Sequence, residues 1–250
     1  MLRWLIAAAL VLAMLAGGVA WYQQPTFRQA RLNQRLVAAV EAHNSSAVTV
    51  LLTDGADPNA RDHWGQTLTL WQRLRYPSYA RERDLYRAEN WQPVLRTATQ
   101  EDDAPIARML LDKGANVNER DVLGSGALSA AAYSNDVDLV GLLLQRGADR
   151  GCQDEALLTA AFWGNTAVAR VLIAHGANVN ARIFSWGSSS TPLMNASGMK
   201  RQATVKLLLR KGADVNFRDE FGYTPLKSAM GNRRPDLYII QTLKQAGAHQ

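Results

Sequence analysis

The sequence contains almost no cysteine: Cys152 is the only one among 250 residues. An internal disulfide is therefore excluded, and the cysteine content fits a reducing or an oxidising compartment equally well. No positioned base is evident near Cys152, so we expect an inert thiol rather than a nucleophile.

The sequence also lacks the patterns of common active sites. Its four histidines are scattered without the spacing of metal ligands: His43, His63, His175 and His249. A phosphate-binding loop, a dinucleotide-binding glycine pattern and a G-x-S-x-G turn are all missing. We therefore predict a protein that is not an enzyme and that uses no cofactor, no metal and no small-molecule substrate. The alternative is an unrecognised active site at Cys152 or within residues 67–92.

The net charge of +6 comes from one end of the chain. Residues 200–250 carry ten basic and four acidic side chains, whereas residues 1–199 carry 18 of each. A basic end can serve as a solvated surface, or it can face an acidic partner or anionic lipid. Because the basic residues are interleaved with acidic ones, we do not expect a nucleic acid partner.

Charged residues are absent between Arg3 and Arg28, and the run from Trp4 to Ala20 is apolar. This run is short for a membrane-spanning helix and long for the core of a signal peptide. We predict that residues 1–24 form a hydrophobic membrane-targeting helix, which is either a single-pass anchor or a cleaved signal peptide. The protein would then lie in a membrane, or in the periplasm or outside the cell. With arginine outnumbering lysine 22 to 6, this N-terminus points to a bacterial source.

A short phrase with a Gly-Ala pair recurs along the rest of the chain. Its glycine stands at positions 55, 114, 147, 176, 212 and 247. A leucine precedes five of these glycines by 19 residues, and Leu226 precedes the sixth by 21; the five are Leu36, Leu95, Leu128, Leu157 and Leu193. The leucines are 59, 33, 29, 36 and 33 residues apart. A period near 33 predicts a solenoid of repeated units.

Each unit has the composition of a helix pair. Thr191-Pro192 and Thr224-Pro225 are typical helix starts, because the hydroxyl caps free amides and proline fits the first turn. Small residues follow, then a turn, then apolar residues three and four apart that predict a second amphipathic helix. The glycine of the Gly-Ala pair ends that helix, because glycine adopts the left-handed conformation cheaply.

These units closely resemble the ankyrin repeat. The matching segments are the helix starts GYTPLKSA, SSTPLMNAS and LGSGALSAAA, the second helices VKLLLRKGADVN and VARVLIAHGANVN, and the D-x-x-G hairpins at 62–65, 121–124 and 219–222. The resemblance covers about six units within residues 31–250. It implies an all-α helical repeat solenoid, built of helix-turn-helix and hairpin loop units, that binds proteins on its concave face and hairpin edge.

The sequence departs locally from this pattern. The hairpin after Gly147 is four residues shorter than the period requires and reads RGCQDE. The hairpin after Gly176 is three residues longer than the period requires. About 26 extra residues, at 67–92, follow the first hairpin. They represent either a degenerate unit or a helix and loop inserted into one.

This insertion is rich in aromatic residues and arginine, which are enriched at binding hot spots. The candidate partner-binding residues in it are Trp71, Arg73, Tyr76, Tyr79, Arg83, Tyr86 and Trp91. Alternatively, the aromatics pack the insertion onto its neighbours and the arginines pair with Glu82, Asp84 and Glu89.

Four apolar residues each precede a hairpin glycine, and these are further binding candidates: Trp64, Leu123, Trp186 and Phe221. Hairpins stacked in register would align them along one edge, where they either contact a partner or pack on one another.

We therefore predict a non-enzymatic protein–protein interaction module, membrane-anchored or exported, that binds one protein partner. Rigid arrays lose little entropy on binding, which suits recognition without chemistry. An inhibitor or immunity-type protein, blocking an enzyme or toxin outside the cytoplasm, would use the same surface and is the alternative.

Overall fold

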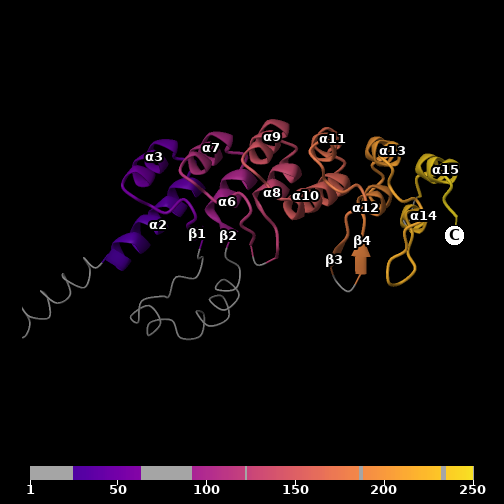
Figure 1. Cartoon of the computed structure of the whole chain (residues 1–250), viewed down its shortest axis with the longest axis horizontal. Helices are drawn as coiled ribbons and strands as arrows, with labels where there is room; N and C mark the ends of the chain where they lie inside the picture. Colours follow the sequence, from indigo (N-terminus) through magenta and orange to yellow (C-terminus); the bar gives the residue numbers. More distant parts are fainter. Residues whose placement is uncertain (1–24, 63–91, 122, 186–187, 232–234, 250) are drawn as a thin grey trace, which may run out of the picture.

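The structure is a row of helix pairs, with a hairpin or loop between successive pairs (Figure 1). It is a computed structural model that describes residues 25–62, 92–121, 123–185, 188–231 and 235–249. Six helix pairs lie in these residues: α2 (Pro25–Glu41) with α3 (Ser45–Thr53), α6 (Val94–Gln100) with α7 (Ala104–Asp112), α8 (Ala127–Ser134) with α9 (Val137–Gln145), α10 (Arg150–Trp163) with α11 (Thr166–Ala174), α12 (Pro192–Gly198) with α13 (Gln202–Arg210), and α14 (Pro225–Met230) with α15 (Leu237–Gln245). We number these pairs as units 1 to 6.

First helices pack on first helices, and second helices pack on second helices in most neighbouring units (Figure 1). The unit leucines occupy matching places in this stack and are at most 2% exposed: Leu36, Leu95, Leu128, Leu157, Leu193 and Leu226. Burying one leucine side chain contributes about 1.5–3 kcal/mol. The predicted all-α repeat solenoid is thereby confirmed, with a core that runs along the row.

The helix starts carry the caps that the sequence indicates. The Thr191 and Thr224 hydroxyls accept hydrogen bonds from the backbone N–H groups of Met194 and Lys227. Several second helices begin at a side chain that the sequence analysis did not single out. Asp103 caps α7, Asp136 caps α9 and Asp236 caps α15. Each cap satisfies an amide that would otherwise lack a partner, worth about 1 kcal/mol.

The loops after the second helices are tied from unit to unit by asparagine side chains. The Asn118 carboxamide accepts from the N–H of Asp149 at 2.7 Å and donates to the Gly147 carbonyl at 3.2 Å. Asn180 makes the equivalent pair of bonds with Asp214 and Gly212. Because each bond joins neighbouring units, these asparagines fix the spacing of the loops.

Two hairpins add short strands to the otherwise helical fold. β1 (Arg61–Asp62) pairs with β2 (Gln92–Pro93), and β3 (Ile183–Ser185) pairs with β4 (Ser188–Ser190), both antiparallel. Units 1 and 2 contact each other directly, through α2 with α6 and α3 with α7. Within the described residues, the chain therefore leaves unit 1 through β1 and enters unit 2 through β2. Residues 63–91 themselves lie outside the described residues.

The prediction of a short hairpin after Gly147 is wrong. Residues Arg150–Trp163 are helical instead, and the Asp149 carboxylate caps the helix by accepting from the N–H of Cys152 at 2.7 Å. The missing four residues leave too little chain for a hairpin, and an aspartate at the cap position starts α10 early. Asp154 of α10 then accepts from the N–H of Asn178, in place of the missing loop asparagine.

The predicted N-terminal hydrophobic helix, residues 1–24, lies outside the described residues. Within the described part of the chain, every helix is too short or too polar to span a bilayer.

Candidate binding surface

Only two of the predicted binding residues lie in the described part of the chain. Leu123 is 84% exposed and Phe221 is 68% exposed, so neither side chain is buried against a neighbouring hairpin. The other candidates lie outside the described residues: Trp64, Trp71, Arg73, Tyr76, Tyr79, Arg83, Tyr86, Trp91 and Trp186.

One turn geometry presents both exposed side chains. The Asp121 carboxylate accepts from the backbone N–H of Leu123 at 2.9 Å and of Ser125 at 2.8 Å. In unit 6 the Asp219 carboxylate accepts from the N–H of Phe221 and of Tyr223 in the same way. In each turn the aspartate accepts two backbone N–H groups of its own loop and so fixes the loop conformation. The apolar residue two positions after the aspartate is left exposed to solvent.

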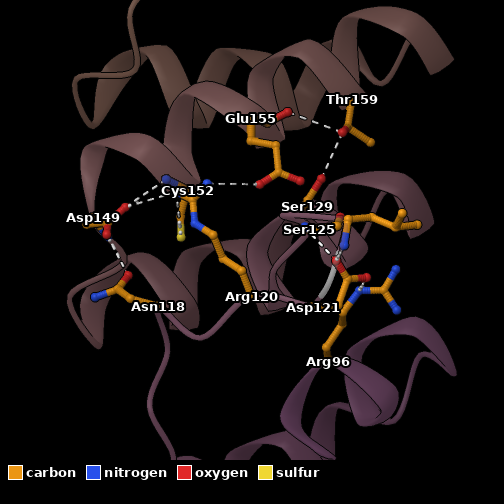
Figure 2. A network of polar contacts seen from close by, with 11 residues as sticks. Arg96, Asn118, Arg120, Asp121, Ser125, Ser129, Asp149, Cys152, Glu155 and Thr159 are labelled. Carbon is orange, nitrogen blue, oxygen red and sulfur yellow. Dashed lines mark hydrogen bonds and ion pairs between the residues drawn. The ribbon is translucent and has the colours of Figure 1, made fainter. Parts of the chain in front are cut away.

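An ion pair fixes the Leu123 hairpin to the preceding unit. Nε of Arg96, on α6, lies 3.2 Å from a carboxylate oxygen of Asp121 (Figure 2). The two side chains are only 17% and 7% exposed, respectively. A pair this well buried is sensitive to the loss of either partner, because the remaining charge would be left unpaired.

A second set of polar side chains joins this hairpin to the following unit. Arg120, at the base of the hairpin, lies 3.7 Å from Glu155 and 3.6 Å from Asp149, both in or at the start of α10 (Figure 2). The Ser129 and Thr159 hydroxyls form a 2.8 Å hydrogen bond between α8 and α10. The Leu123 hairpin is thus braced on both sides, which makes it a rigid element of the surface.

Glu155 is a largely buried carboxylate of this network, and the guanidinium that it faces, Arg120, lies 3.7 Å away. The Glu155 side chain is 13% exposed, and burial raises its pKa, although hydrogen bonds from Ser125 and Ser129 partly oppose the rise. Because Arg120 stands beyond hydrogen-bonding distance, the charged form of Glu155 is incompletely compensated.

Cys152 lies next to this network but has the wrong properties for a nucleophile. The residue is 1% exposed, and burial raises the pKa of the thiol to about 11. Nearly all of it is therefore protonated at neutral pH, and the thiolate is the reactive form. Within the described residues, no three His, Cys, Asp or Glu side chains gather in a way that could hold a metal ion.

The sequence analysis missed an aromatic cluster at the ends of the first helices. Tyr133 on α8 meets Trp163 on α10 edge to face, with ring centroids 4.9 Å apart, and Phe162 meets Trp163 at 5.5 Å. These three side chains, which we call the aromatic platform, are 36–52% exposed. Superimposing the units on their leucines gives the signal: Tyr133 and Phe162 both stand five residues after a unit leucine.

The hairpins of units 5 and 6 are also joined. The N–H and hydroxyl of Ser189, on β4, donate to the two carboxylate oxygens of Glu220 at 2.7 and 2.6 Å. The Ser189 hydroxyl, followed by its N–H, lowers the pKa of Glu220. This contact holds the Phe221 loop against the preceding hairpin.

Comparisons with known proteins agree with this architecture. Residues 95–183 match the family model for ankyrin repeats in three copies, and residues 189–220 match the model for a single ankyrin repeat. The crystal structure of the human ASB11 ankyrin repeat domain superimposes with a TM-score of 0.63, covering 86% of this chain and 84% of that domain at 24% identity.

Two curated relatives match at the same identity over different shares of the chain. The B-cell lymphoma 3 protein homologue of Mus musculus is 32% identical over 81% of this chain, and this chain spans only 41% of that protein. The putative ankyrin repeat protein YahD of Escherichia coli is 32% identical over 56% of this chain and 72% of its own length.

Human transient receptor potential cation channel subfamily A member 1 also matches, at 26% identity over 85% of this chain, but this chain spans 21% of the channel subunit. The repeat register, the buried leucines and these similarities agree, and the chain belongs to the ankyrin repeat family, whose fold generally serves as a non-enzymatic scaffold for protein interactions.

Proposed function

We propose that this protein is a non-enzymatic module that binds one protein partner through its concave face, its hairpin tips and the 71–91 insertion. The observation that carries the proposal is the exposure of Leu123 and Phe221 on braced hairpins. Apolar side chains on rigid loops lose little entropy on binding and gain the full benefit of burial.

The described residues on either side of the insertion, Arg61–Asp62 and Gln92–Pro93, form the β1–β2 pair, which occupies the hairpin position between units 1 and 2. The aromatic and arginine residues of the insertion belong to the types enriched at hot spots. We therefore assign it to partner specificity.

Partner capture by pull-down tests the proposal. Leu123→Ser and Phe221→Ser should weaken capture of the partner, whereas Val50→Ser should not, because Val50 is 58% exposed on the second helix of unit 1. All three proteins should melt at similar temperatures, since exposed residues contribute little to stability. Equal capture by the hairpin variants and the control would refute the hairpin edge as the binding surface.

Deleting residues 76–90 tests the insertion separately. We expect helical content and cooperative melting to stay nearly intact while partner capture weakens. Collapse of folding would assign the segment a structural role instead.

We further propose that residues 1–24 bring the array to a membrane or across it, since this segment is apolar with one charge, Arg3. Fractionation of the full chain and of a chain lacking residues 1–24 tests this. The full chain should enter the membrane or an exported pool, and the shortened chain should not. Identical distribution of the two would contradict the assignment.

A further inference from the structure

The turns between the two helices of units 1 to 5 repeat one backbone conformation. Seven residues after the unit leucine, φ is positive in five successive units: at His43, Asp102, Asn135, Gly164 and Lys200. The shared conformation means that the side chains flanking these residues occupy equivalent places along the array. They form one row, which we call the turn row.

The aromatic platform lies in the middle of the turn row. Tyr133 precedes the turn of unit 3, and Phe162 and Trp163 precede the turn of unit 4. Met199, 37% exposed, occupies the same place in unit 5 as Trp163 does in unit 4. Partly exposed aromatic rings in contact provide a stacking surface for another flat or apolar group.

The charge of the turn row changes sign across this platform. On the unit 2 side, Glu101 and Asp102 are exposed; on the unit 5 side, Lys200 is exposed and Arg201 is half-buried. The unit 4 turn between them, Gly164-Asn165, carries no charge. One side of the platform is therefore acidic and the other basic.

Other charged groups near the row are already engaged. Asp103 caps α7 and lies 3.2 Å from His43, and Asp136 caps α9. Asp236 accepts from the Gln202 side chain at 2.8 Å and faces Lys200. The acidic pair Glu101–Asp102 and the basic pair Lys200–Arg201 are the charges that a ligand along the row would meet, with Lys200 partly balanced by Asp236.

Arg201 also ties the basic end to the platform. Its Nε donates to the Phe162 carbonyl at 3.0 Å, and its side chain runs beside Gly164. A ligand resting on the aromatic rings would therefore meet a guanidinium immediately beyond them.

These observations point to a peptide and not to a polyanion. A nucleic acid strand or an anionic lipid surface would gain at Lys200 and lose at Glu101 and Asp102. From unit 2 to unit 5 the row crosses three helix-to-helix spacings of about 8–10 Å each, or about 24–30 Å in all. An extended peptide, which advances about 3.3 Å per residue, covers that distance in about nine residues.

We propose that the turn row binds an extended segment of about nine residues on a protein partner, with an aromatic or proline centre on the platform, acidic residues at Lys200 and Arg201, and basic residues at Glu101 and Asp102. This inference rests on the proposed function and adds the chemistry of the partner. It concerns a different set of side chains from the hairpin tips.

Fluorescence anisotropy with synthetic peptides tests the chemistry directly. The probe is a labelled nonapeptide of three lysines, a Pro-Tyr-Pro centre and three aspartates, added to the full-length chain in mild detergent. The comparison peptide has the same composition with lysine and aspartate alternating. We expect the segregated peptide to bind at least about five-fold tighter, because its charges match the order of the charges along the turn row. The comparison is made at low salt, since high salt screens these interactions. Equal affinity for the two peptides would overturn the proposal.

Variants of the protein locate the binding site. Trp163→Ala should weaken binding of the segregated peptide at least about ten-fold, as expected of a hot-spot aromatic, and Trp163→Phe should restore most of it. Val50→Ala, an exposed apolar change on α3, is the control and should bind like wild type. Folding of each variant is verified by its melting temperature. A folded Trp163→Ala protein with wild-type affinity would contradict the site.

A charge change should alter specificity in a defined direction. Lys200→Glu places a carboxylate beside Arg201 and removes the net positive charge of the basic pair, so this variant should lose its preference for the segregated peptide over one with lysines at both ends. An unchanged preference would contradict the assigned orientation. Partner capture by Trp163→Ala separates the two proposals: if capture is lost with Leu123→Ser and retained with Trp163→Ala, the proposed function stands and the peptide site fails.

Discussion

The guanidinium of Arg96 and the carboxylate of Asp121 lie 3.2 Å apart across the junction between units 2 and 3, and both are largely buried. Asp121 also accepts two backbone N–H groups that shape the Leu123 turn. One side chain therefore links the stack of helices to the conformation of the hairpin.

Replacement of Asp121 by alanine should destabilise the array by about 2–4 kcal/mol, because it leaves the Arg96 charge and two amides without this acceptor. Asp121→Asn keeps an acceptor and should cost less. Urea denaturation measures both changes. The prediction is wrong if the two variants lose equal stability, because the charge and the turn would then not be separable contributions.

Gly176 ends α11 with φ of +103°, and an added Cβ would meet no atom within 4 Å. Gly176→Val should therefore destabilise the protein through backbone strain alone, by at least about 1 kcal/mol. Thermal melting provides the measurement, and an unchanged melting temperature would contradict the assigned end of the helix.

Gly141 is the matched control, because it lies inside α9 without a positive φ and its Cβ direction is also open. Gly141→Ala should stabilise the protein by about 0.5–1 kcal/mol, since alanine is the better helix former. If the two substitutions change stability in opposite directions, both effects come from backbone conformation and not from packing, because neither added Cβ meets a neighbouring atom.

The periodic parts of this fold could be predicted from sequence. The Leu95, Leu128 and Leu193 positions and the glycine helix ends recur in every unit, and the threonine caps recur in units 5 and 6, so each was supported by its counterparts. The helical conformation of Arg150–Gln153 could not be obtained in this way, because it arises where the period itself is broken and Asp149 becomes a cap.

The aromatic platform shows a different limit. Tyr133 and Trp163 are 30 residues apart in sequence and 4.9 Å apart in space, and aligning the units brings them together. Exposure of large apolar side chains does not follow from residue type, since Leu158 is 5% exposed while Leu123 is 84% exposed. Whether a side chain faces solvent depends on how neighbouring units pack. The sequence pattern of a single unit does not specify that packing.

Glu155 should make stability depend on pH in a specific direction. Burial raises its pKa above the ordinary value of 4.5, so the folded state holds this proton at a pH where the unfolded chain has released it. The stability associated with this group is fully present below pH 4.5 and declines as pH rises through the raised pKa. The melting temperature of wild type minus that of Glu155→Gln should therefore decrease between pH 4.5 and pH 7.5.

Glu101→Gln is the control for this measurement, because Glu101 is exposed at the end of α6. It reports the general effect of removing one negative charge. If the melting temperature of wild type increases relative to that of the Glu155→Gln variant as the pH rises, the carboxylate is stabilised in the folded state. The assigned role of burial would then be wrong.

Cys152 should be almost unreactive in the folded protein. At pH 8, a thiol with a pKa of about 11 is ionised in roughly one molecule in a thousand, and only 1% of the residue is exposed. Alkylation by iodoacetamide, followed by mass spectrometry, should therefore be slow in buffer and fast in 8 M urea, where the chain is unfolded and the ordinary pKa returns. Because the chain has one cysteine, every labelled molecule reports this site. Labelling of the native protein at the rate seen in urea would mean an accessible, activated thiol, and would restore Cys152 as a candidate nucleophile.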